Sequence, residues 1–255
     1  MNNIFDTHAH YNDSAFDADR ETLLASLPGA GSCALINCGT DIESSMASLA
    51  LADKYSYIFA ACGVHPEEVD KAYDGYIEDL KKLLSHKKCV AVGEIGLDYH
   101  YTSENKELQK KIFREQIILA NECTLPVIIH DREAHGDTLE IIKELRPQGV
   151  LHCFSGSAET MREVVALGMY IGLGGAVTFK NAKKPLEVAA AVPEDRLLLE
   201  TDCPYMAPVP MRGKRNDSTL IPYAAKVIAD VRGTTAEHIL EVTKRNAGRL
   251  FLGDR

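Results

Sequence analysis

The feature that most constrains the fold of this chain is an alternation of short apolar runs with longer segments of helical character. The runs are rich in β-branched residues, and helical crossovers between such runs predict a parallel sheet. Eight of them occur, at Ile4–His10, Cys33–Gly39, Ile58–Val64, Val90–Leu97, Pro126–His130, Gly149–Phe154, Tyr170–Val177 and Leu197–Asp202. A chain of 255 residues with no Pro/Gly/Ser-rich linker favours one domain, a (β/α)8 TIM barrel over residues 1–255. A doubly wound open sheet is the alternative α/β fold.

Two helices are predicted most clearly between and after these runs. The first, Glu104–Cys123, places apolar side chains on one face at Leu108, Ile112, Phe113, Ile117 and Ala120. The second, Thr234–Leu252, opens with Thr234 and Glu237 at capping-box spacing. Its inward face is expected to hold Ile239, Leu240, Thr243, Ala247 and Leu250. This last helix is expected to close the fold.

The charge balance limits how the chain can meet nucleic acid. Lys and Arg number 28 against 37 Asp and Glu, which gives a net charge of −9. Such a balance opposes tight, sequence-independent binding to nucleic acid through a broad basic face. It leaves a nucleic-acid substrate open, because an enzyme can contact phosphates through bound cations.

The cysteines and the hydropathy pattern indicate a compartment. No basic segment followed by a long apolar run marks a secretory signal, and no stretch approaches the roughly 18 apolar residues that span a bilayer. Seven cysteines are scattered without a C-x-x-C pair, so neither a disulfide framework nor a zinc knuckle is indicated. We therefore expect a cytoplasmic protein that has no membrane contact, and no obligate protein partner is evident.

Six residues with metal-binding side chains fall at or near the carboxyl ends of five predicted strands, where barrel enzymes place their catalytic groups. They are His8, His10, Glu94, His130, His152 and Asp202. His8 and His10 are two positions apart, so both face the barrel interior. Imidazoles and carboxylates together suit a divalent cation, and six ligands exceed what one catalytic ion takes. Two ions that share Glu94 account better for the set, with Zn²⁺, Mn²⁺ and Mg²⁺ all compatible.

Other residues near the set are open to more than one interpretation. A single histidine in an apolar strand is more often structural, and only the gathering of six candidates at one end favours metal binding. Cys153 and Cys203 are expected to point away from the barrel as small hydrophobes. Glu200 is expected either to support the site or to form an unrelated ion pair. The histidines expected to be solvated are His86, His100, His135 and His238.

Contacts to a substrate are predicted from the loops at the same end. His65 follows the third run and is either a substrate contact or a turn residue before Pro66. The loop after the last run carries Arg212, Lys214, Arg215 and Asn216. This basic stretch is either a solvated charge run or a phosphate contact. Ser155 follows His152 and could offer a backbone amide to a phosphate.

Nine sequence blocks together resemble the TatD family of metal-dependent deoxyribonucleases over essentially the whole chain. They are FDTHAHY, GVHPE, VGEIGLDYH, QKKIFREQIILA, PVIIHDREA, HCFSG, LLLETDCPY, GKRN and NAGRLF. The resemblance implies a (β/α)8 metallohydrolase that cleaves phosphodiester bonds in DNA from the 3′ end with divalent cations. The family's ligand positions match all six metal candidates. The family usually has Glu and Pro after the Asn of GKRN, whereas here Asp217 and Ser218 follow Asn216, so the contacts of this loop are expected to differ.

The catalytic hypothesis assigns roles within the six residues. His8 and His10 with Asp202 are expected to hold one ion, and His130 with His152 the other, both sharing Glu94. Asp202 is expected to accept the proton of the attacking water.

RNA remains open as a substrate beside DNA. Two alternatives to a nuclease also remain open. The first is an amidohydrolase-type metallohydrolase of a small amide, lactone or phosphoester. A carboxylated lysine on strand four would favour it, and that strand carries Glu94 instead. The second is a non-catalytic binding protein, for which a broken ligand set is expected, and all six positions are intact.

Overall fold

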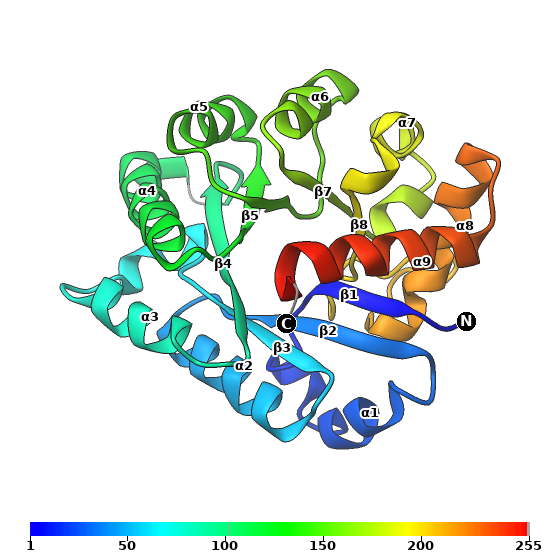
Figure 1. Ribbon diagram of the computed structural model, residues 1–255, viewed down its shortest axis with the longest axis horizontal. Coiled ribbons are helices and arrows are strands. Elements are labelled where there is room, and N and C mark those ends of the chain that lie inside the picture. Colours follow the sequence, from blue (N-terminus) through cyan, green and yellow to red (C-terminus); the bar gives the residue numbers. More distant parts are fainter. Residues whose placement is uncertain (102, 254–255) are drawn as a thin grey trace.

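The computed structural model describes residues 1–101 and 103–253, which form a barrel of parallel strands inside a ring of helices (Figure 1). The strands are β1 (Ile4–Ala9), β2 (Ser32–Cys38), β3 (Ile58–Cys62), β4 (Cys89–Asp98), β5 (Val127–Arg132), β6 (Gly149–Leu151), β7 (Tyr170–Leu173) and β8 (Leu197–Leu199). Each strand pairs in parallel with the next along the chain, in the order β1 to β8. The predicted (β/α)8 barrel is confirmed, and the doubly wound sheet is wrong because the strand order never reverses.

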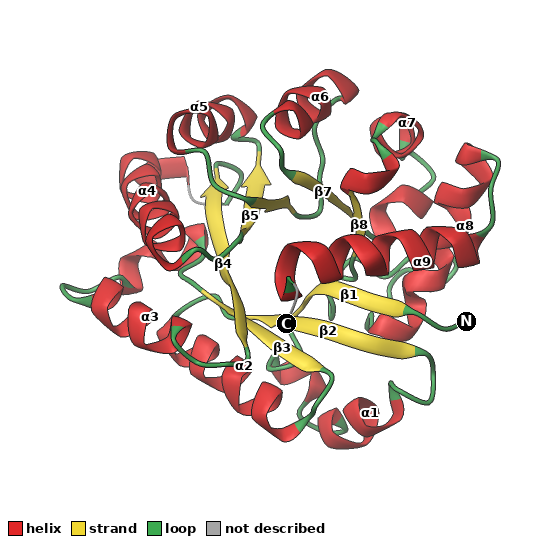
Figure 2. Ribbon diagram, in the orientation of Figure 1, coloured by secondary structure: helices red, strands yellow, loops and turns green. Residues whose placement is uncertain are grey.

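Helices cover the outside of the strands (Figure 2). They are α1 (Arg20–Ser26), α2 (Ile42–Lys54), α3 (Tyr76–Leu84), α4 (Lys106–Cys123), α5 (His135–Leu145), α6 (Ala158–Ala166), α7 (Lys183–Ala191), α8 (Ile221–Arg232) and α9 (Ala236–Ala247). In α4 the predicted apolar face is buried at Ile112, Phe113, Ile117 and Ala120. No helix in the described residues is long and apolar enough to cross a membrane.

The last helix begins one residue later than its capping pattern predicts. Thr235 is the N-cap, and its side chain accepts the N–H of His238. Thr234 instead donates its N–H to the Ala229 carbonyl, because it belongs to the turn that ends α8 at Gly233. A capping pair of Thr234 and Glu237 is therefore wrong by one position.

The chain beyond α9 closes the amino-terminal end of the barrel. The helix continues as a π-helical turn over Gly248–Leu252. Phe251 is buried there in a cluster with side chains from early strand positions, among them Phe5, Val90 and Ile128. This packing fills the lower barrel, so only the carboxyl end is left for a site.

Strands β6 to β8 are shorter than their apolar runs predict. Beyond the ends of β6 and β8 the backbone adopts positive φ at Cys153 (42°) and Asp202 (58°), and after β7 residues Gly175–Thr178 form a 3-10 turn. Positive φ is unusual for residues other than glycine, and residue type alone does not predict it. His152 and Asp202 therefore lie just beyond their strands, in irregular backbone.

The seam between the first strand, β1, and the last strand, β8, is closed by hydrogen bonds from the residues that follow β8. The N–H of Asp202 donates to the His8 carbonyl at 2.9 Å. The buried Asp6 carboxylate accepts the backbone N–H of Thr201 at 3.0 Å and its hydroxyl at 2.6 Å. Burial outweighs these hydrogen bonds and raises the pKa of Asp6 to about 7. The seam brings residues from opposite ends of the sequence side by side.

Candidate metal centre

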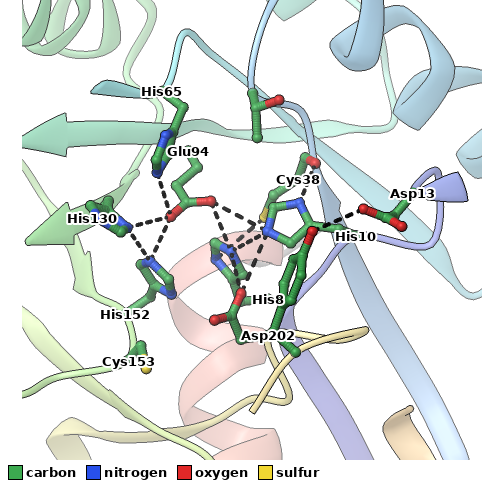
Figure 3. Close-up of polar contacts among 12 residues, drawn as sticks. His8, His10, Asp13, Cys38, His65, Glu94, His130, His152, Cys153 and Asp202 are labelled. Atoms are coloured by element: carbon green, nitrogen blue, oxygen red, sulfur yellow. Dashed lines mark hydrogen bonds and ion pairs between the residues drawn. The ribbon is translucent and has the colours of Figure 1, made fainter. Parts of the chain in front are cut away.

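Glu94 of β4 lies at the centre of a cluster of imidazoles at the carboxyl end of the barrel (Figure 3). Its Oε1 lies 2.9 Å from His130 Nδ1 and 2.7 Å from His152 Nε2. Its Oε2 lies 3.2 Å from His8 Nε2 and 3.3 Å from His10 Nε2. The two oxygens of one buried carboxylate thus face two separate pairs of histidines.

Asp202 completes the cluster from the seam. Its Oδ1 lies 3.7 Å from His8 Nε2 and 3.6 Å from His10 Nε2. The described residues offer compact groups of donor atoms that all lie within 4.8 Å of one another. These groups are His8–His10–Glu94, His8–His152–Asp202 and His65–Glu94–His130. The structure therefore brings all six predicted residues together, and their mixed nitrogen and oxygen donors fit a divalent cation.

The ring nitrogens that face away from the centre are held by neighbouring groups. His10 Nδ1 lies 3.0 Å from the Cys38 carbonyl oxygen, and His8 Nδ1 lies 3.5 Å from Cys38 Sγ. His130 Nε2 lies 3.0 Å from Asp98 Oδ2. Protein metal sites orient their histidines by such a hydrogen bond at the second nitrogen. The arrangement directs Nε2 of His8 and His10 and Nδ1 of His130 at the centre.

Asp98 is a functional candidate that sequence reasoning missed. It is the last residue of β4, is fully buried, and also accepts the N–H groups of His100 at 2.9 Å and Tyr101 at 2.8 Å. Its position four residues after Glu94 on the same strand would have indicated it, because strand positions of equal parity share a face.

Glu200 lies against the centre rather than in a distant ion pair. It is buried, its Oε1 accepts the N–H of Cys153, and the same oxygen lies 3.7 Å from His152 Nδ1. Cys153 itself lies apart from the ring of donors in Figure 3. Neither it nor the buried Cys203 belongs to the donor groups of the described residues. The predicted separation of both cysteines from the centre agrees with this placement.

The four histidines expected to be solvated are partly exposed and lie outside the donor groups found in the described residues. Each lies within ion-pair distance of a carboxylate: His86 of Asp53, His100 of Glu133, His135 of Asp131 and His238 of Glu194.

The pKa shifts of the cluster favour ionised carboxylates beside protonated imidazoles. Burial raises the pKa of Glu94, but the charges of His152 and His8 outweigh it and hold that pKa well below its usual range. Burial lowers the pKa of His10, but hydrogen bonds to Asp202 and Glu94 overcome it and raise the pKa to about 10. The buried Glu94 and the partly buried Asp202 therefore stay ionised beside protonated imidazoles, and a bound cation can supply the same positive charge.

A cavity of about 720 Å³ opens over the centre. We call it the first cavity; its lining includes His10, Glu94, His130 and Asp202. Of the predicted substrate contacts, His65 lies in it. The Nδ1 of His65 accepts the N–H of Glu67 at 3.2 Å, and its Nε2 lies 3.4 Å from Glu94 Oε1.

A second cavity of about 460 Å³ adjoins the first. The three basic residues predicted to contact phosphate, Arg212, Lys214 and Arg215, line this second cavity. Both cavities share Asp13, Tyr205 and Met206 in their walls. Tyr205, inside the ETDCPY block, was not predicted as a site residue.

Two other predicted contacts lie elsewhere. Ser155 is exposed and is not among the described residues that line either cavity. Asn216 is buried, and its side-chain amide donates to the carbonyls of Thr201 at 2.9 Å and Tyr205 at 2.7 Å. Its observed contacts hold the end of the loop against the residues that follow β8.

Comparison with known proteins places the whole chain in one group. The family model described as TatD related DNase matches residues 5–252. An uncharacterized metal-dependent hydrolase, YabD of Bacillus subtilis, is 43% identical and is aligned over 97% of this chain and 98% of its own. The 3'-5' ssDNA/RNA exonuclease TatD of Cronobacter sakazakii is 35% identical over 98% of each chain. The crystal structure of YJJV, a TatD homolog from Escherichia coli, covers 98% of both chains with a TM-score of 0.92 and 35% identity.

Proposed function

Because this chain belongs to the TatD family of metal-dependent hydrolases, we propose that it hydrolyses phosphodiester bonds in DNA from the 3′ end. The observation that carries the proposal is the convergence of four histidines and two carboxylates at the carboxyl end of the barrel. Four of these six residues line the first cavity. The relative named as an exonuclease of single-stranded DNA and RNA supports this class of substrate.

The two oxygens of Glu94 support a division into two cation sites. Oε2 faces His8 and His10, next to Asp202, and Oε1 faces His130 and His152. We assign His8, His10 and Asp202 to one ion. We assign His130 and His152 to the other, with Glu94 shared by both. Divalent cations held there would acidify a bound water and neutralise charge on the phosphate oxygens.

Protein groups would position and deprotonate the reactants. The Asp202 side chain is 20% exposed, whereas that of Glu94 is 4% exposed, so Asp202 is the carboxylate more open to a water in the cavity. We assign it the role of proton acceptor. Because Nδ1 of His65 accepts a hydrogen bond, the neutral ring carries its proton on Nε2. We assign that N–H to a phosphate oxygen of the substrate.

The test compares Glu94→Gln with Glu194→Gln, a carboxylate replacement at the opposite end of the barrel. Protein stripped with a chelator is reloaded with Mn²⁺, Mg²⁺ or Zn²⁺ and given 5′-labelled single-stranded DNA and RNA, with small ester, amide and lactone substrates beside them. The reloaded wild type is expected to shorten DNA one nucleotide at a time from the 3′ end. Glu94→Gln should lose on the order of 100-fold or more in rate with an unchanged melting temperature, since even residues behind metal ligands cost 10–100-fold.

The control Glu194→Gln should keep the wild-type rate on DNA. DNA cleavage by the metal-free Glu94→Gln protein would contradict the assignment of Glu94. Turnover of a lactone or amide with no DNA cleavage would move the function to the small-substrate hydrolases.

A further inference from the structure

One wall of the second cavity is Tyr205, which is fixed by hydrogen bonds from its backbone and its hydroxyl. Tyr205 lines both cavities, and the residue is 58% exposed. Its backbone N–H donates to the Asp202 carbonyl at 2.9 Å, and its carbonyl accepts from Asn216. Its hydroxyl donates to Asp13 Oδ2 at 3.1 Å. An exposed ring fixed at both ends, three residues after a proposed metal ligand, is a stacking surface that needs little further ordering.

Charge is distributed unevenly between the two cavities. The first cavity is lined by the carboxylates of Asp13, Glu67, Glu68, Glu94 and Asp202, with Arg132 as the Lys or Arg side chain among its described residues. The second cavity is lined by Arg212, Lys214 and Arg215, with Asp13 as the carboxylate among the described residues of its wall. A polyanionic chain that places one phosphate at the metal centre is therefore drawn toward the second cavity and away from Glu67 and Glu68.

The basic residues of the second cavity differ in how free they are. Arg215 pairs through two nitrogens with Asp19, at 2.7 Å each. The guanidinium carbon of Arg212 lies 3.9 Å from the centre of the Phe179 ring. This stacking leaves the N–H groups at the edge of the guanidinium open to hydrogen bonds. Lys214 is exposed, and within residues 1–101 and 103–253 neither it nor Arg212 forms an ion pair with the protein. Arg212 and Lys214 thus face the second cavity without a counter-ion among the described residues.

We infer that the second cavity is a nucleotide subsite, which binds the nucleotide on the 5′ side of the scissile phosphodiester with its base on Tyr205. The next phosphate of the chain then lies beside Lys214 and Arg212. This inference rests on the proposed function and adds where the uncut strand runs. It requires an unpaired base at that position, because base-pairing in a duplex keeps the base stacked on its neighbours rather than on the protein.

The stacking is tested with two pentanucleotides that differ at one position. One is normal, and the other carries an abasic analogue in place of the penultimate nucleotide. Wild-type kcat/KM is expected to be roughly tenfold lower on the abasic strand, within the range of base stacking on an aromatic ring. Tyr205→Ala should lose a similar factor on the normal strand and nothing further on the abasic one. Tyr205→Phe keeps the ring and should restore the discrimination.

The phosphate contact is tested with Lys214→Ala, and Lys87→Ala is the control. Lys87 is an exposed lysine in the connection before β4, at the opposite end of the barrel. Lys214→Ala should raise KM for the pentanucleotide several-fold. KM for the dinucleotide, which lacks the next phosphate, should stay within about twofold of wild type. It should also reduce the slope of log affinity against log salt by about 1. Lys87→Ala should change neither.

Each outcome is decisive. If the losses in kcat/KM from Tyr205→Ala and from the abasic strand multiply, the two act independently and the stacking is overturned. If neither change lowers kcat/KM, the stacking is overturned as well. Equal effects of Lys214→Ala on both substrate lengths would overturn the phosphate contact. If the metal-loaded wild type cleaves neither length, the proposed function fails and the subsite fails with it.

Discussion

Replacing Asp98 by Asn should weaken metal binding by changing which nitrogen of His130 carries a proton. One oxygen of Asp98 accepts the N–H groups of His100 and Tyr101, and the other lies 3.0 Å from His130 Nε2. An Asn side chain has one oxygen, which the two backbone N–H groups retain, so its NH₂ group faces His130. Two donors cannot share a hydrogen bond, so Nε2 must accept and the proton moves to Nδ1. That nitrogen lies 2.9 Å from Glu94 Oε1 and is the proposed ligand atom.

The size of the effect follows from this change of tautomer. Loss of a group that orients a metal-bound histidine costs about 10–100-fold in affinity. Here Nδ1 of His130 carries the proton and offers no lone pair to the ion, and the ring also loses the carboxylate that orients it. We therefore expect the upper end of this range, about 100-fold or ~2.7 kcal/mol. The loss should fall on one of the two proposed sites, because His8 and His10 are held by Cys38 instead.

The assay is a competition titration of chelator-stripped protein with Zn²⁺ against a fluorescent chelator, with thermal melting to check the fold. Asp131→Asn is the matched control, since Asp131 follows His130 directly but pairs with His135 at 2.7 Å. It should bind Zn²⁺ within about threefold of wild type. The reasoning is refuted if Asp98→Asn binds both ions like wild type, or if Asp131→Asn loses as much.

Two further predictions concern stability. Asn216→Ala leaves the buried carbonyl of Thr201 and the partly buried carbonyl of Tyr205 without their amide donor. It should lower the free energy of unfolding by about 2–4 kcal/mol in urea denaturation, and a loss below about 0.5 kcal/mol would contradict this account. Gly96→Ala places a Cβ 1.9 Å from the His130 carbonyl oxygen at φ +150°. It should cost about 3 kcal/mol or more, against roughly 1 kcal/mol for Gly168→Ala, where φ is +89° and no atom lies within 4 Å.

The barrel could be predicted from the sequence because strand starts follow from local patterns. Each predicted run begins within one residue of an observed strand, as at Ile58 and Leu197. Strand ends were less predictable: β8 stops at Leu199, although the run reaches Asp202. The left-handed backbone of Asp202 follows from contacts across the seam, and residue type carries no trace of those contacts.

The candidate site divides in the same way. His8, His10 and Glu94 could be placed together because parallel strands bring their carboxyl ends to one mouth. His152 and Asp202 could be placed as well, because each follows its strand within three residues. Residues further along the loops could not, since the direction of their side chains depends on tertiary hydrogen bonds. Asn216 was predicted to contact substrate, yet its amide is engaged by the protein, whereas Tyr205 received no role and stands in the wall of both cavities.

The hydrogen bond between Asp202 and the His8 carbonyl also bears on how the protein is made. The donor set draws on residue 8 and residue 202, so 201 of the 255 residues must be synthesised before its last member exists. A chain still emerging from the ribosome has no closed seam, and Asp202 cannot reach the other donor residues until the last strand joins the first. The complete donor set therefore forms late in synthesis, once the residues after β8 have reached β1.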